Sequence, residues 1–418
     1  MQPTNQILLF KEIEEARDTL GDLGISTPTA YNTNLSTEFS ASVYLKREDL
    51  QVVRSYKLRG AYNKIKGLEE AQSTRGIVCA SAGNHAQGVA YSCHLLDISA
   101  KIYMPLGTTV QKVKQVQRFG KNNVEIILGG ATYDDACELA KQEATASNRM
   151  FIHPFDDHKI IAGQGTVGLE IIESLHVPID YVFVPIGGGG LASGIVTAFA
   201  ALSPQTRIIG VEPAGAASMK LSVERGINTT LESIDRFVDG AAVKRVGELT
   251  FPICQEGLHG IVAVPEGKVC STLLRLYNEE AMVVEPAGAL SIAALDHYKE
   301  EIRGKVAVCI VTGGNNDVTR MEEIRERSLA YEGLKHYFRI RLEQRPGSLK
   351  SFITEVLGED DDLTYFQFSE KDKREHGHAV VGIGLKSKED LQGIISRLDA
   401  RNYKYSHLSG QEDLFVVG

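Results

Sequence analysis

Short apolar runs rich in β-branched residues alternate along the chain with longer stretches in which apolar positions recur at helical spacing, from about Gly76 onward. That alternation predicts helices packed on both faces of a largely parallel sheet. The predicted strands are Gly76–Cys79, Lys101–Met104, Glu125–Leu128, Tyr181–Val184, Ile208–Val211 and Val306–Val311. The predicted helices include His85–Leu96, Val110–Phe119, Asp134–Ser147 and Leu191–Leu202.

The pattern changes near Tyr331, where apolar and polar residues begin to alternate strictly. The remaining chain predicts strand, helix, strand, strand, helix and a short strand at Leu414–Val417, an order typical of a small α+β sandwich of about 80 residues. We therefore predict an α/β domain over residues 1–330, with a smaller subdomain over about 50–150, and an α+β domain over residues 331–418.

Composition and charge narrow the classes of partner. The 418 residues are 43% hydrophobic, enough for a sizeable core, and the net charge of -9 leaves no broad basic field for nucleic acid or an anionic membrane. The amino terminus has no basic stretch followed by an apolar run, which favours a cytoplasmic protein. The six cysteines are scattered without zinc-like spacing, as expected of reduced core residues.

A run of four glycines, Gly187 to Gly190, lies in PIGGGGLASG between a predicted strand and an apolar helix. Amides at a helix start carry partial positive charge, and glycines allow an anion to approach them without meeting a Cβ atom. The placement favours a phosphate-binding loop over a flexible surface turn. A dinucleotide is one candidate ligand, because Gly187, Gly189 and Ala192 fit GxGxxG/A and Glu212 follows the next strand as a ribose-binding acid would.

Polar residues also follow two other predicted strands. SAGNHAQG places Ser81 and Asn84 after one strand, and Thr312 follows the apolar run VAVCIV. Capping by these side chains is the simpler interpretation of each motif alone. Together with Lys57, however, they supply an amide donor, a hydroxyl and an amine beside a phosphate loop, which are the parts needed to hold a phosphorylated aromatic aldehyde as an imine.

At this level of detail the sequence resembles the fold-type II family of pyridoxal-phosphate enzymes, and within it the biosynthetic threonine dehydratases (threonine ammonia-lyases). Seven ordered motifs carry the resemblance and span roughly residues 46–317. They are KREDLQVVRSYKLRGA, SAGNHAQGVA, HPFDDHKIIAGQGT, PIGGGGLASG, VDGAAV, VEPAGA and TGGNND. The tail from about His336 is similar to the ACT-like regulatory domain of the same enzymes, with RPGSL at the strand-to-helix turn.

The resemblance implies roles for individual residues. Lys57 would form the imine with the cofactor, Asn84 would donate to the 3-oxygen of its ring, and Thr312 would face its pyridine nitrogen. The phosphate would be bound by the amides of Gly187, Gly188, Gly189, Gly190 and Leu191.

Further residues of the same motifs would complete the site. Ser81, Ala82 and Gly83 would bind the substrate carboxylate, and Gly240 would line the ring edge. Glu285 precedes Pro286 and reads equally well as a helix-start residue or as a cofactor-binding residue.

The implied reaction converts L-threonine to 2-oxobutanoate and ammonia, the first committed step of isoleucine biosynthesis. Lys57 would remove the Cα proton, and the β-hydroxyl would leave with a proton from the cofactor phosphate. His85 and His153 are therefore expected to orient turns or to satisfy backbone carbonyls, since Lys57 already covers the proton transfer.

Two departures from related sequences sharpen the assignment. Racemases of this family carry a second serine where this chain has Ala82, so racemisation is expected to be minor. Metal-dependent relatives carry an acid where this chain has Ser218, which leaves too few oxygen ligands, and no essential divalent metal is predicted.

The tail implies regulation and assembly. Isoleucine would inhibit by binding near Arg345 to Leu349 or at an interface between two tails, with valine as the candidate activator. Edge strands of so small a sandwich favour pairing between subunits, and a homotetramer is expected. A tail that only assembles the oligomer is the alternative.

Three other functions stay open at this point. They are a serine/threonine dehydratase of the catabolic type, a nicotinamide-dependent oxidoreductase that uses the Gly187–Gly190 loop, and an amino-acid-sensing regulator with a vestigial catalytic domain. The joint presence of Lys57, Asn84 and Thr312 argues against the last two.

Overall fold

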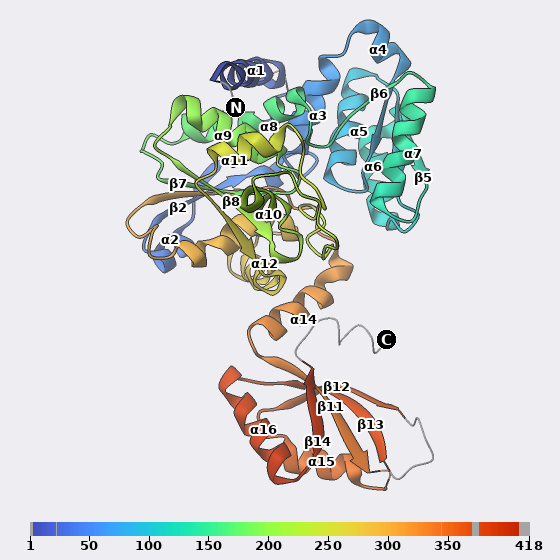
Figure 1. Cartoon of the computed structure of the whole chain (residues 1–418), viewed down its shortest axis with the longest axis vertical. Helices are drawn as coiled ribbons and strands as arrows, with labels where there is room; N and C mark the ends of the chain where they lie inside the picture. The colour runs from blue at the N-terminus through green and yellow to red at the C-terminus, as the bar shows by residue number, and fades with distance from the viewer. Residues whose placement is uncertain (1–2, 22, 344, 370–375, 409–418) are drawn as a thin grey trace. The chain divides into compact units, whose positions relative to one another are not determined.

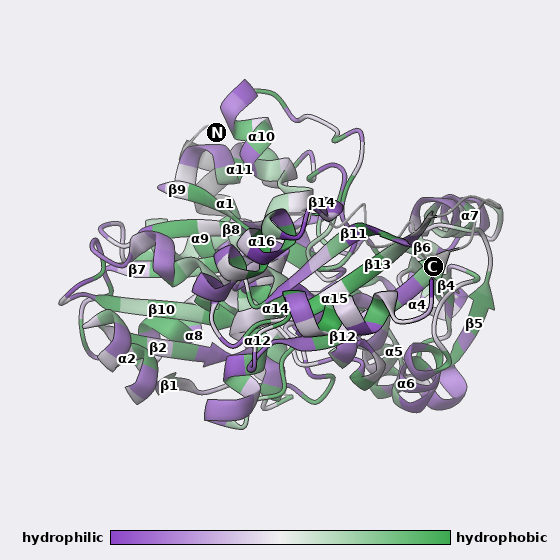
Figure 2. Cartoon of the chain, turned by 90° about the horizontal axis from the view of Figure 1, so that it is seen from below, coloured by the Kyte–Doolittle hydropathy of each residue, from purple (hydrophilic) through white to green (hydrophobic). Residues whose placement is uncertain are grey.

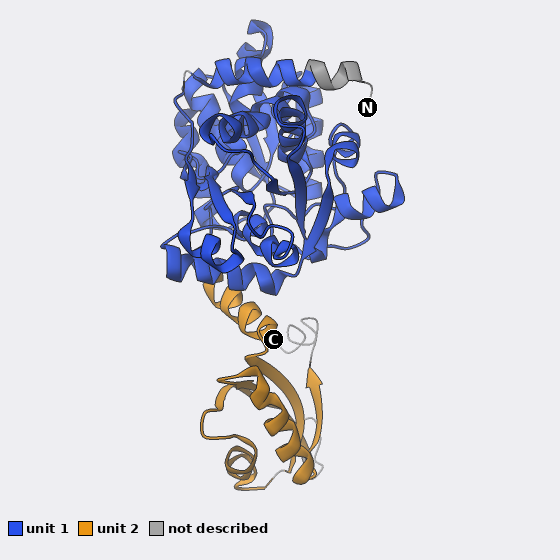
Figure 3. Cartoon of the chain, turned by 90° about the vertical axis from the view of Figure 1, so that its left-hand side faces the viewer, with its two compact units in different colours: residues 1–318 blue, residues 319–418 orange. Residues whose placement is uncertain are grey.

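The computed structural model describes residues 3–21, 23–343, 345–369 and 376–408. The chain divides into two compact units, residues 1–318 and 319–418, which are coloured separately in Figure 3. The boundary expected at 330/331 stays a prediction about independent folding. Among the described residues, no helix is both long and apolar enough to cross a membrane.

The first unit contains a six-stranded sheet in the order β1-β2-β10-β7-β8-β9. β1 is antiparallel to β2, and the other neighbouring strands run parallel. The strands are β1 Thr29–Tyr31, β2 Ser42–Arg47, β7 Tyr181–Pro185, β8 Arg207–Pro213, β9 Gly260–Val264 and β10 Val306–Val311. The parallel arrangement brings the carboxyl ends of β7, β8 and β10 to one edge, where open α/β sheets bind ligands.

Helices cover both faces of this sheet (Figure 1). α8 (His158–Ser174), α9 (Gly190–Leu202) and α11 (Thr250–Gly257) lie on one side, and α12 (Glu266–Glu280) lies on the other. The central strands are therefore buried on both faces: β7 is buried along its whole length, and β10 is green throughout in Figure 2. Further helices of this unit are α1 Pro3–Gly21, α2 Thr33–Phe39, α3 Lys57–Lys66, α4 Glu70–Arg75, α10 Ser218–Arg225 and α13 Pro286–Ala293.

A smaller four-stranded parallel sheet has the order β5-β4-β3-β6. Its strands are β3 Ile77–Ala80, β4 Ala100–Met104, β5 Val124–Leu128 and β6 Met150–Phe151. α5 (Asn84–Leu96) and α6 (Val110–Gly120) pack on one face through Val89 and Val116, and α7 (Tyr133–Ala146) packs on the other through Ala140. This sheet carries the polar turn SAGNHAQG at the carboxyl end of β3.

The six strands predicted from periodicity are confirmed to within two residues at each end, and so are the four predicted helices. The prediction omitted β1, β2, β6 and β9. β2 ends in Lys46 and Arg47, and charged residues ordinarily mark an exposed position, but Lys46 is fully buried. All six cysteines are unpaired thiols, and five are buried while Cys137 is half-buried.

The second unit begins with α14 (Met321–Tyr331) and continues as a four-stranded antiparallel sheet in the order β12-β13-β11-β14. Its elements are β11 Lys335–Glu343, α15 Ser348–Val356, β12 Asp362–Ser369, β13 His376–Gly384, α16 Leu391–Ala400 and β14 Lys404–Leu408. The two helices bury Phe352 and Leu398 against the sheet. The predicted order of elements is confirmed through α16. The strand expected at Leu414–Val417 lies outside the described residues, and β14 was not predicted.

Candidate active site

The glycine run forms the turn between β7 and α9. Gly189 has a φ of +94°, a conformation that side chains with a Cβ rarely adopt, and it precedes the first residue of the helix. A Cβ atom on Gly188 would overlap the ring of Phe155. The first N–H groups of a helix have no acceptor within it, so the amides of this turn can donate hydrogen bonds to an anion.

Gln164 lies beside the turn, on α8. Its side chain is 1% exposed, and neither its amide nitrogen nor its carbonyl oxygen has a hydrogen-bond partner among the described residues. A Cβ atom on Gly190 would lie 2.6 Å from Gln164 Oε1, and one on Gly60 would lie 3.1 Å from Nε2. Its amide thus spans the gap between the glycine turn and α3.

Lys57 is the first residue of α3 and is half-buried. Its Nζ atom donates to the backbone carbonyl of Pro154 at 2.9 Å, and the next residue, Phe155, places its ring against Gly188 of the glycine turn. Burial lowers the pKa of Lys57 to about 8, although the charge of Glu285 acts in the opposite direction. A larger share of this amine is therefore neutral near pH 7 than for an exposed lysine.

Close backbone contacts hold Lys57 against two other elements. A Cβ atom on Gly88 of α5 would lie 3.1 Å from the carbonyl of Lys57, so the two helices touch there. The preceding segment pairs with the chain after β10: Ser55 and Gly313 form an antiparallel bridge, and the N–H of Tyr56 donates to the carbonyl of Thr312 at 3.2 Å. The ends of β3 and β10 therefore meet at the start of α3.

Asn84, the first residue of α5, contacts Glu285 directly. Asn84 Nδ2 donates to Glu285 Oε1 at 2.6 Å, and Glu285 precedes α13 as its N-cap residue without capping it through its side chain. Burial raises the pKa of Glu285 to about 7, the charge of Asp239 adds to the increase, and the hydrogen bond from Asn84 reduces it. A Cβ atom on Gly240 would lie 3.5 Å from Glu285 Oε1, which places the VDGAAV motif beside this pair.

Ser81, Ala82 and Gly83 form the turn before α5. The hydroxyl of Ser81 accepts a hydrogen bond from the N–H of Gly83 at 3.1 Å, and Gly83 is the N-cap residue without a side-chain cap. Neither Ser81 nor Asn84 caps the helix through its side chain, so capping does not account for this motif.

Thr312 follows β10 and is 2% exposed. Its hydroxyl oxygen has no hydrogen-bond partner among the described residues. A buried hydroxyl without a partner costs free energy, and a ligand that forms a hydrogen bond with it would recover that cost.

The two histidines satisfy backbone groups, as the sequence led us to expect. His85 Nε2 lies 3.0 Å from the carbonyl of Ile152, and His153 Nδ1 accepts from the N–H of Asp156 at 2.8 Å. Burial lowers the pKa of His85 to about 3 and that of His153 to about 4. Both rings are neutral across the physiological range.

Glu212 does not serve as the acid of a ribose site. It is fully buried, and its two carboxylate oxygens accept from the N–H groups of Met219 at 2.7 Å and Lys220 at 2.8 Å, at the start of α10. Burial raises the pKa of Glu212 to about 8, although these two hydrogen bonds act against the increase. In the described part of the chain, no three His, Cys, Asp or Glu side chains lie close enough to hold a metal ion, and the absence of an essential divalent metal stays a prediction.

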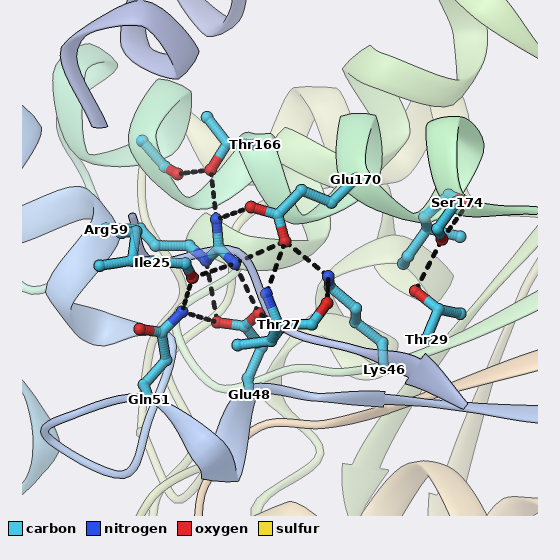
Figure 4. A network of polar contacts seen from close by, with 12 residues as sticks. Ile25, Thr27, Thr29, Lys46, Glu48, Gln51, Arg59, Thr166, Glu170 and Ser174 are labelled. Carbon is cyan, nitrogen blue, oxygen red and sulfur yellow. Dashed lines mark hydrogen bonds and ion pairs between the residues drawn. The ribbon is translucent and has the colours of Figure 1, made fainter. Parts of the chain in front are cut away.

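A buried ion network surrounds Arg59, two residues after Lys57 on α3 (Figure 4). Arg59 Nε and Nη2 donate to Glu48 at 2.9 and 2.8 Å, and Nη1 donates to Glu170 at 2.6 Å and to Thr166 at 3.1 Å. Lys46 Nζ donates to Glu170 at 2.5 Å. Burial opposes the charge on Arg59, but Glu48 and Glu170 raise its pKa above the ordinary value. The network joins β2, α3 and α8.

The second unit has an open pocket at the strand-to-helix turn between β11 and α15. It is lined by Arg345, residues 347–350, Ile353 and Thr354. Gly347 precedes α15 with a φ of +92°, and the RPGSL motif therefore adopts the turn that its proline and glycine predict.

The structure thus brings most of the predicted site residues to one edge of the two sheets, while their individual roles stay predictions. Sequence reasoning overlooked Gln164 and Arg59, although both lie within motifs that we singled out. The available signal was their residue type: a polar or charged side chain on a helix that also presents a glycine-rich face is a candidate for burial.

Two family models match the chain. Residues 21–313 match the model described as a pyridoxal-phosphate dependent enzyme. Residues 326–417 match the C-terminal regulatory domain of threonine dehydratase. Together these matches cover most of both units.

Individual relatives agree with the family models. A biosynthetic L-threonine dehydratase of Halalkalibacterium halodurans is 53% identical, with 97% of this chain and 98% of that protein covered. The corresponding Bacillus subtilis protein is 51% identical, with 98% and 97% covered. Among solved structures, processed threonine deaminase isoform 2 of Solanum lycopersicum is 38% identical with a TM-score of 0.74, and 78% of this chain and 94% of that chain are covered.

The residues present fit the cofactor of this family. The glycine turn offers amide donors in a space that a Cβ atom would fill, Thr312 has a buried hydroxyl without a partner in the described structure, and Lys57 has an amine with a lowered pKa. Pyridoxal phosphate has an anionic phosphate, a ring nitrogen and an aldehyde that match these three groups. The chain therefore belongs to the pyridoxal-phosphate-dependent enzymes, and within that family to the biosynthetic threonine dehydratases.

Proposed function

We propose that this protein is a threonine ammonia-lyase, a carbon–nitrogen lyase that converts L-threonine to 2-oxobutanoate and ammonia at the start of isoleucine biosynthesis. The single observation that carries the proposal is that the ends of β3 and β10, which precede Asn84 and Thr312, meet at Lys57, in a chain that is 53% identical to a biosynthetic threonine dehydratase. A cytoplasmic location is part of the proposal and rests on the sequence features described above.

Bound pyridoxal phosphate supplies an electron-withdrawing ring that stabilises negative charge at the substrate Cα atom. Lys57 would attach it covalently, and Gly187 to Leu191 would bind its phosphate through backbone amides. Asn84 would donate to its ring oxygen. The Thr312 hydroxyl would donate to its ring nitrogen, and a neutral hydroxyl does not force that nitrogen to be protonated, which favours elimination over transamination.

The remaining steps belong to the side chains around the substrate. With its amine free, Lys57 would take the Cα proton through its Nζ atom, and a pKa near 8 suits a general base at neutral pH. The turn at Ser81, Ala82 and Gly83 binds the substrate carboxylate through amides or the serine hydroxyl. Ala82 has no group that can exchange a proton on the opposite face of Cα.

Replacing Lys57 tests the assignment. Lys57→Ala should lower the rate of 2-oxobutanoate formation at least about 10³-fold, because both attachment and proton transfer are lost. The matched control is Lys64→Ala, since Lys64 lies on the same helix but pairs with Asp157 at 2.6 Å. Borohydride reduction of the wild-type holoenzyme should leave the label on Lys57. Undiminished turnover in Lys57→Ala would reject the proposal.

Substrate preference needs the same assay with two amino acids. One methyl group in an apolar pocket discriminates by only about 1–3 kcal/mol, so the preference for threonine over serine is expected to be at most about 200-fold in kcat/KM. A ratio near one would favour the catabolic serine/threonine alternative.

The second unit is proposed to bind isoleucine as an inhibitor, with valine as the opposing effector, in a homotetramer. The proposal is supported by the match to a regulatory domain and by the pocket at Arg345. Saturating isoleucine should lower turnover, and Arg345→Ala should weaken that inhibition several-fold. Lys386→Ala, a change at an exposed ion pair with Asp360, is the control. Unchanged turnover at saturating isoleucine would indicate that the tail only assembles the oligomer. Analytical ultracentrifugation measures the oligomeric state.

A further inference from the structure

The side-chain amide of Asn84 is held at both ends. Its Nδ2 atom donates to Glu285 Oε1 at 2.6 Å, and its Oδ1 atom accepts from Asn315 Nδ2 at 2.7 Å. Glu285 is buried, and Asn84 and Asn315 are half-buried. An amide group has two donor hydrogens on nitrogen, so one hydrogen of Asn84 Nδ2 is still available after the bond to Glu285.

Asn84 alone does not determine which way its amide points, because the two ends of an amide have similar size and can exchange places. Glu285 does not determine it either. A carboxylate only accepts, but a protonated carboxyl group also donates, and burial brings the pKa of Glu285 to about 7, where both forms are populated. A protonated Glu285 can pair with either end of the Asn84 amide.

Asn315 has a partner that leaves no such choice. Its Nδ2 atom donates to the backbone carbonyl of Val53 at 2.9 Å, and a carbonyl oxygen can only accept. Turning the Asn315 amide over would place two oxygen atoms against each other. The two hydrogens of Asn315 Nδ2 therefore point to Val53 and to Asn84, and Asn84 must present its oxygen to Asn315 and its nitrogen to the other side.

The Val53 carbonyl is itself held in place. Val53 is fully buried, and the neighbouring backbone is tied to the chain after β10 by a bond from the N–H of Gly314 to the carbonyl of Arg54 at 2.9 Å. The bridge between Ser55 and Gly313 continues this pairing toward Lys57. The orientation of the Asn84 amide therefore depends, through Asn315, on a hydrogen-bonded backbone segment next to Lys57.

We propose that Asn315 is a positioning residue that fixes the Asn84 amide with its NH₂ group, rather than its oxygen, toward the ring oxygen of pyridoxal phosphate. The inference rests on the proposed roles of Lys57 and Asn84. A donor at the ring oxygen favours the tautomer in which that oxygen is ionised and the imine nitrogen carries the proton. An acceptor there favours the tautomer in which the ring oxygen keeps the proton.

Asn315→Asp tests this assignment at a pH where the introduced side chain is ionised, because an ionised aspartate has the same shape as asparagine but offers only acceptors. Asn84 should turn its nitrogen toward the introduced carboxylate and its oxygen toward the ring. The absorbance of the resting holoenzyme should then shift from the long-wavelength tautomer band to the short-wavelength band, by about three- to tenfold in their ratio, the size expected for one hydrogen bond. Asn315→Ala, which removes the constraint without reversing it, should give a smaller shift in the same direction.

A double-mutant cycle separates orientation from the added charge of aspartate. In an Asn84→Ala background, Asn315→Asp should change the band ratio by less than about twofold, because the amide that it turns is absent. Asn32→Ala is the control for loss of a hydrogen-bonded asparagine elsewhere in the same unit, since Asn32 caps α2 by accepting from the N–H of Leu35. It should lower the melting temperature and leave the band ratio unchanged.

Two results would overturn the inference alone: an unchanged band ratio in Asn315→Asp, or an equal shift with and without Asn84. Both are read on a holoenzyme whose borohydride label lies on Lys57. If the wild-type label does not lie on Lys57, the proposed function fails first and this inference fails with it.

Discussion

Two polar regions lie on opposite sides of α3 and differ in how completely their hydrogen bonds are made. Lys57 donates to the carbonyl of Pro154, and Arg59, two residues later and therefore about 200° around the helix, lies in the ion network (Figure 4). In the network, Arg59 donates to Glu48, Thr166 and Glu170. On the Lys57 side, Thr312 and Gln164 have buried polar atoms without partners among the described residues.

The contrast separates scaffold from site. A buried polar network whose members are all paired rigidifies a fold, whereas a buried polar atom without a partner costs free energy that a ligand can recover. The network around Arg59 therefore holds α3 in place, and the buried polar atoms without partners on the Lys57 side are the proposed cofactor contacts. Stability and ligand binding should accordingly respond in opposite ways to mutations on the two sides.

The largest effect on stability is expected from Arg59→Ala. Removing this guanidinium leaves the carboxylates of Glu48 and Glu170 buried without their main partner, which should lower the free energy of unfolding by about 3–5 kcal/mol. Chemical denaturation measures it. The control is Glu248→Ala, which breaks an exposed pair with Arg245 and should cost less than about 1 kcal/mol. Equal costs for the two variants would remove the distinction between network and surface.

The second effect is a pH dependence of the free energy of unfolding, which has opposite signs for Glu285 on the Lys57 side and for Glu170 in the network. The folded-state pKa of Glu285 is raised by burial from 4.5 to about 7, so between these values the folded cofactor-free protein holds a proton that the unfolded chain has lost. Its free energy of unfolding should fall as pH rises through this window, with a contribution of up to about 1.4 kcal/mol per pH unit. Glu285→Gln should remove that slope.

Glu170 should behave in the reverse manner. Burial opposes its charge, but Arg59 and Lys46 lower its pKa below the ordinary value of 4.5. The stabilisation is therefore present above pH 4.5 and is lost as pH falls through the folded-state pKa. Glu170→Gln should flatten the acid side of the stability profile and leave the region near neutrality unaltered in shape. A flattening above pH 4.5 instead would contradict the assignment.

The smallest expected change in stability comes from removing a single threonine hydroxyl, at Thr312 or at Thr166. Thr312→Val removes a buried hydroxyl without a partner in the described structure, so the cofactor-free protein should gain about 1 kcal/mol, while the affinity for pyridoxal phosphate falls about tenfold. Thr166→Val removes a hydroxyl that donates to Gly163 at 2.7 Å and accepts from Arg59, so it should lose about 1–2 kcal/mol. Denaturation with and without cofactor measures both. A loss of stability in cofactor-free Thr312→Val would contradict this interpretation.

Much of this architecture could be predicted from periodicity. β10 and β7 are short apolar runs buried on both faces, and α9 is apolar around most of its surface, so burial and sequence pattern coincide. β2 was missed for the opposite reason: Lys46 is a charged residue in a buried strand, and its burial depends on Glu170, which is 124 positions away in sequence. No local pattern reveals a partner at that distance.

The sequence by itself determined the alternation of strands and helices, the glycine turn before α9 and the identity of the lysine in SYKLRG, because each depends on residues that are neighbours along the chain. The tertiary structure decided which polar groups are paired. Asn315 and Arg59 acquire their roles only when Val53, Asn84, Glu48 and Glu170 are brought to them by packing. Hydrogen bonding is directional and short-ranged. Which buried polar groups find a partner, and which are left for a ligand, is therefore decided only once the chain is folded.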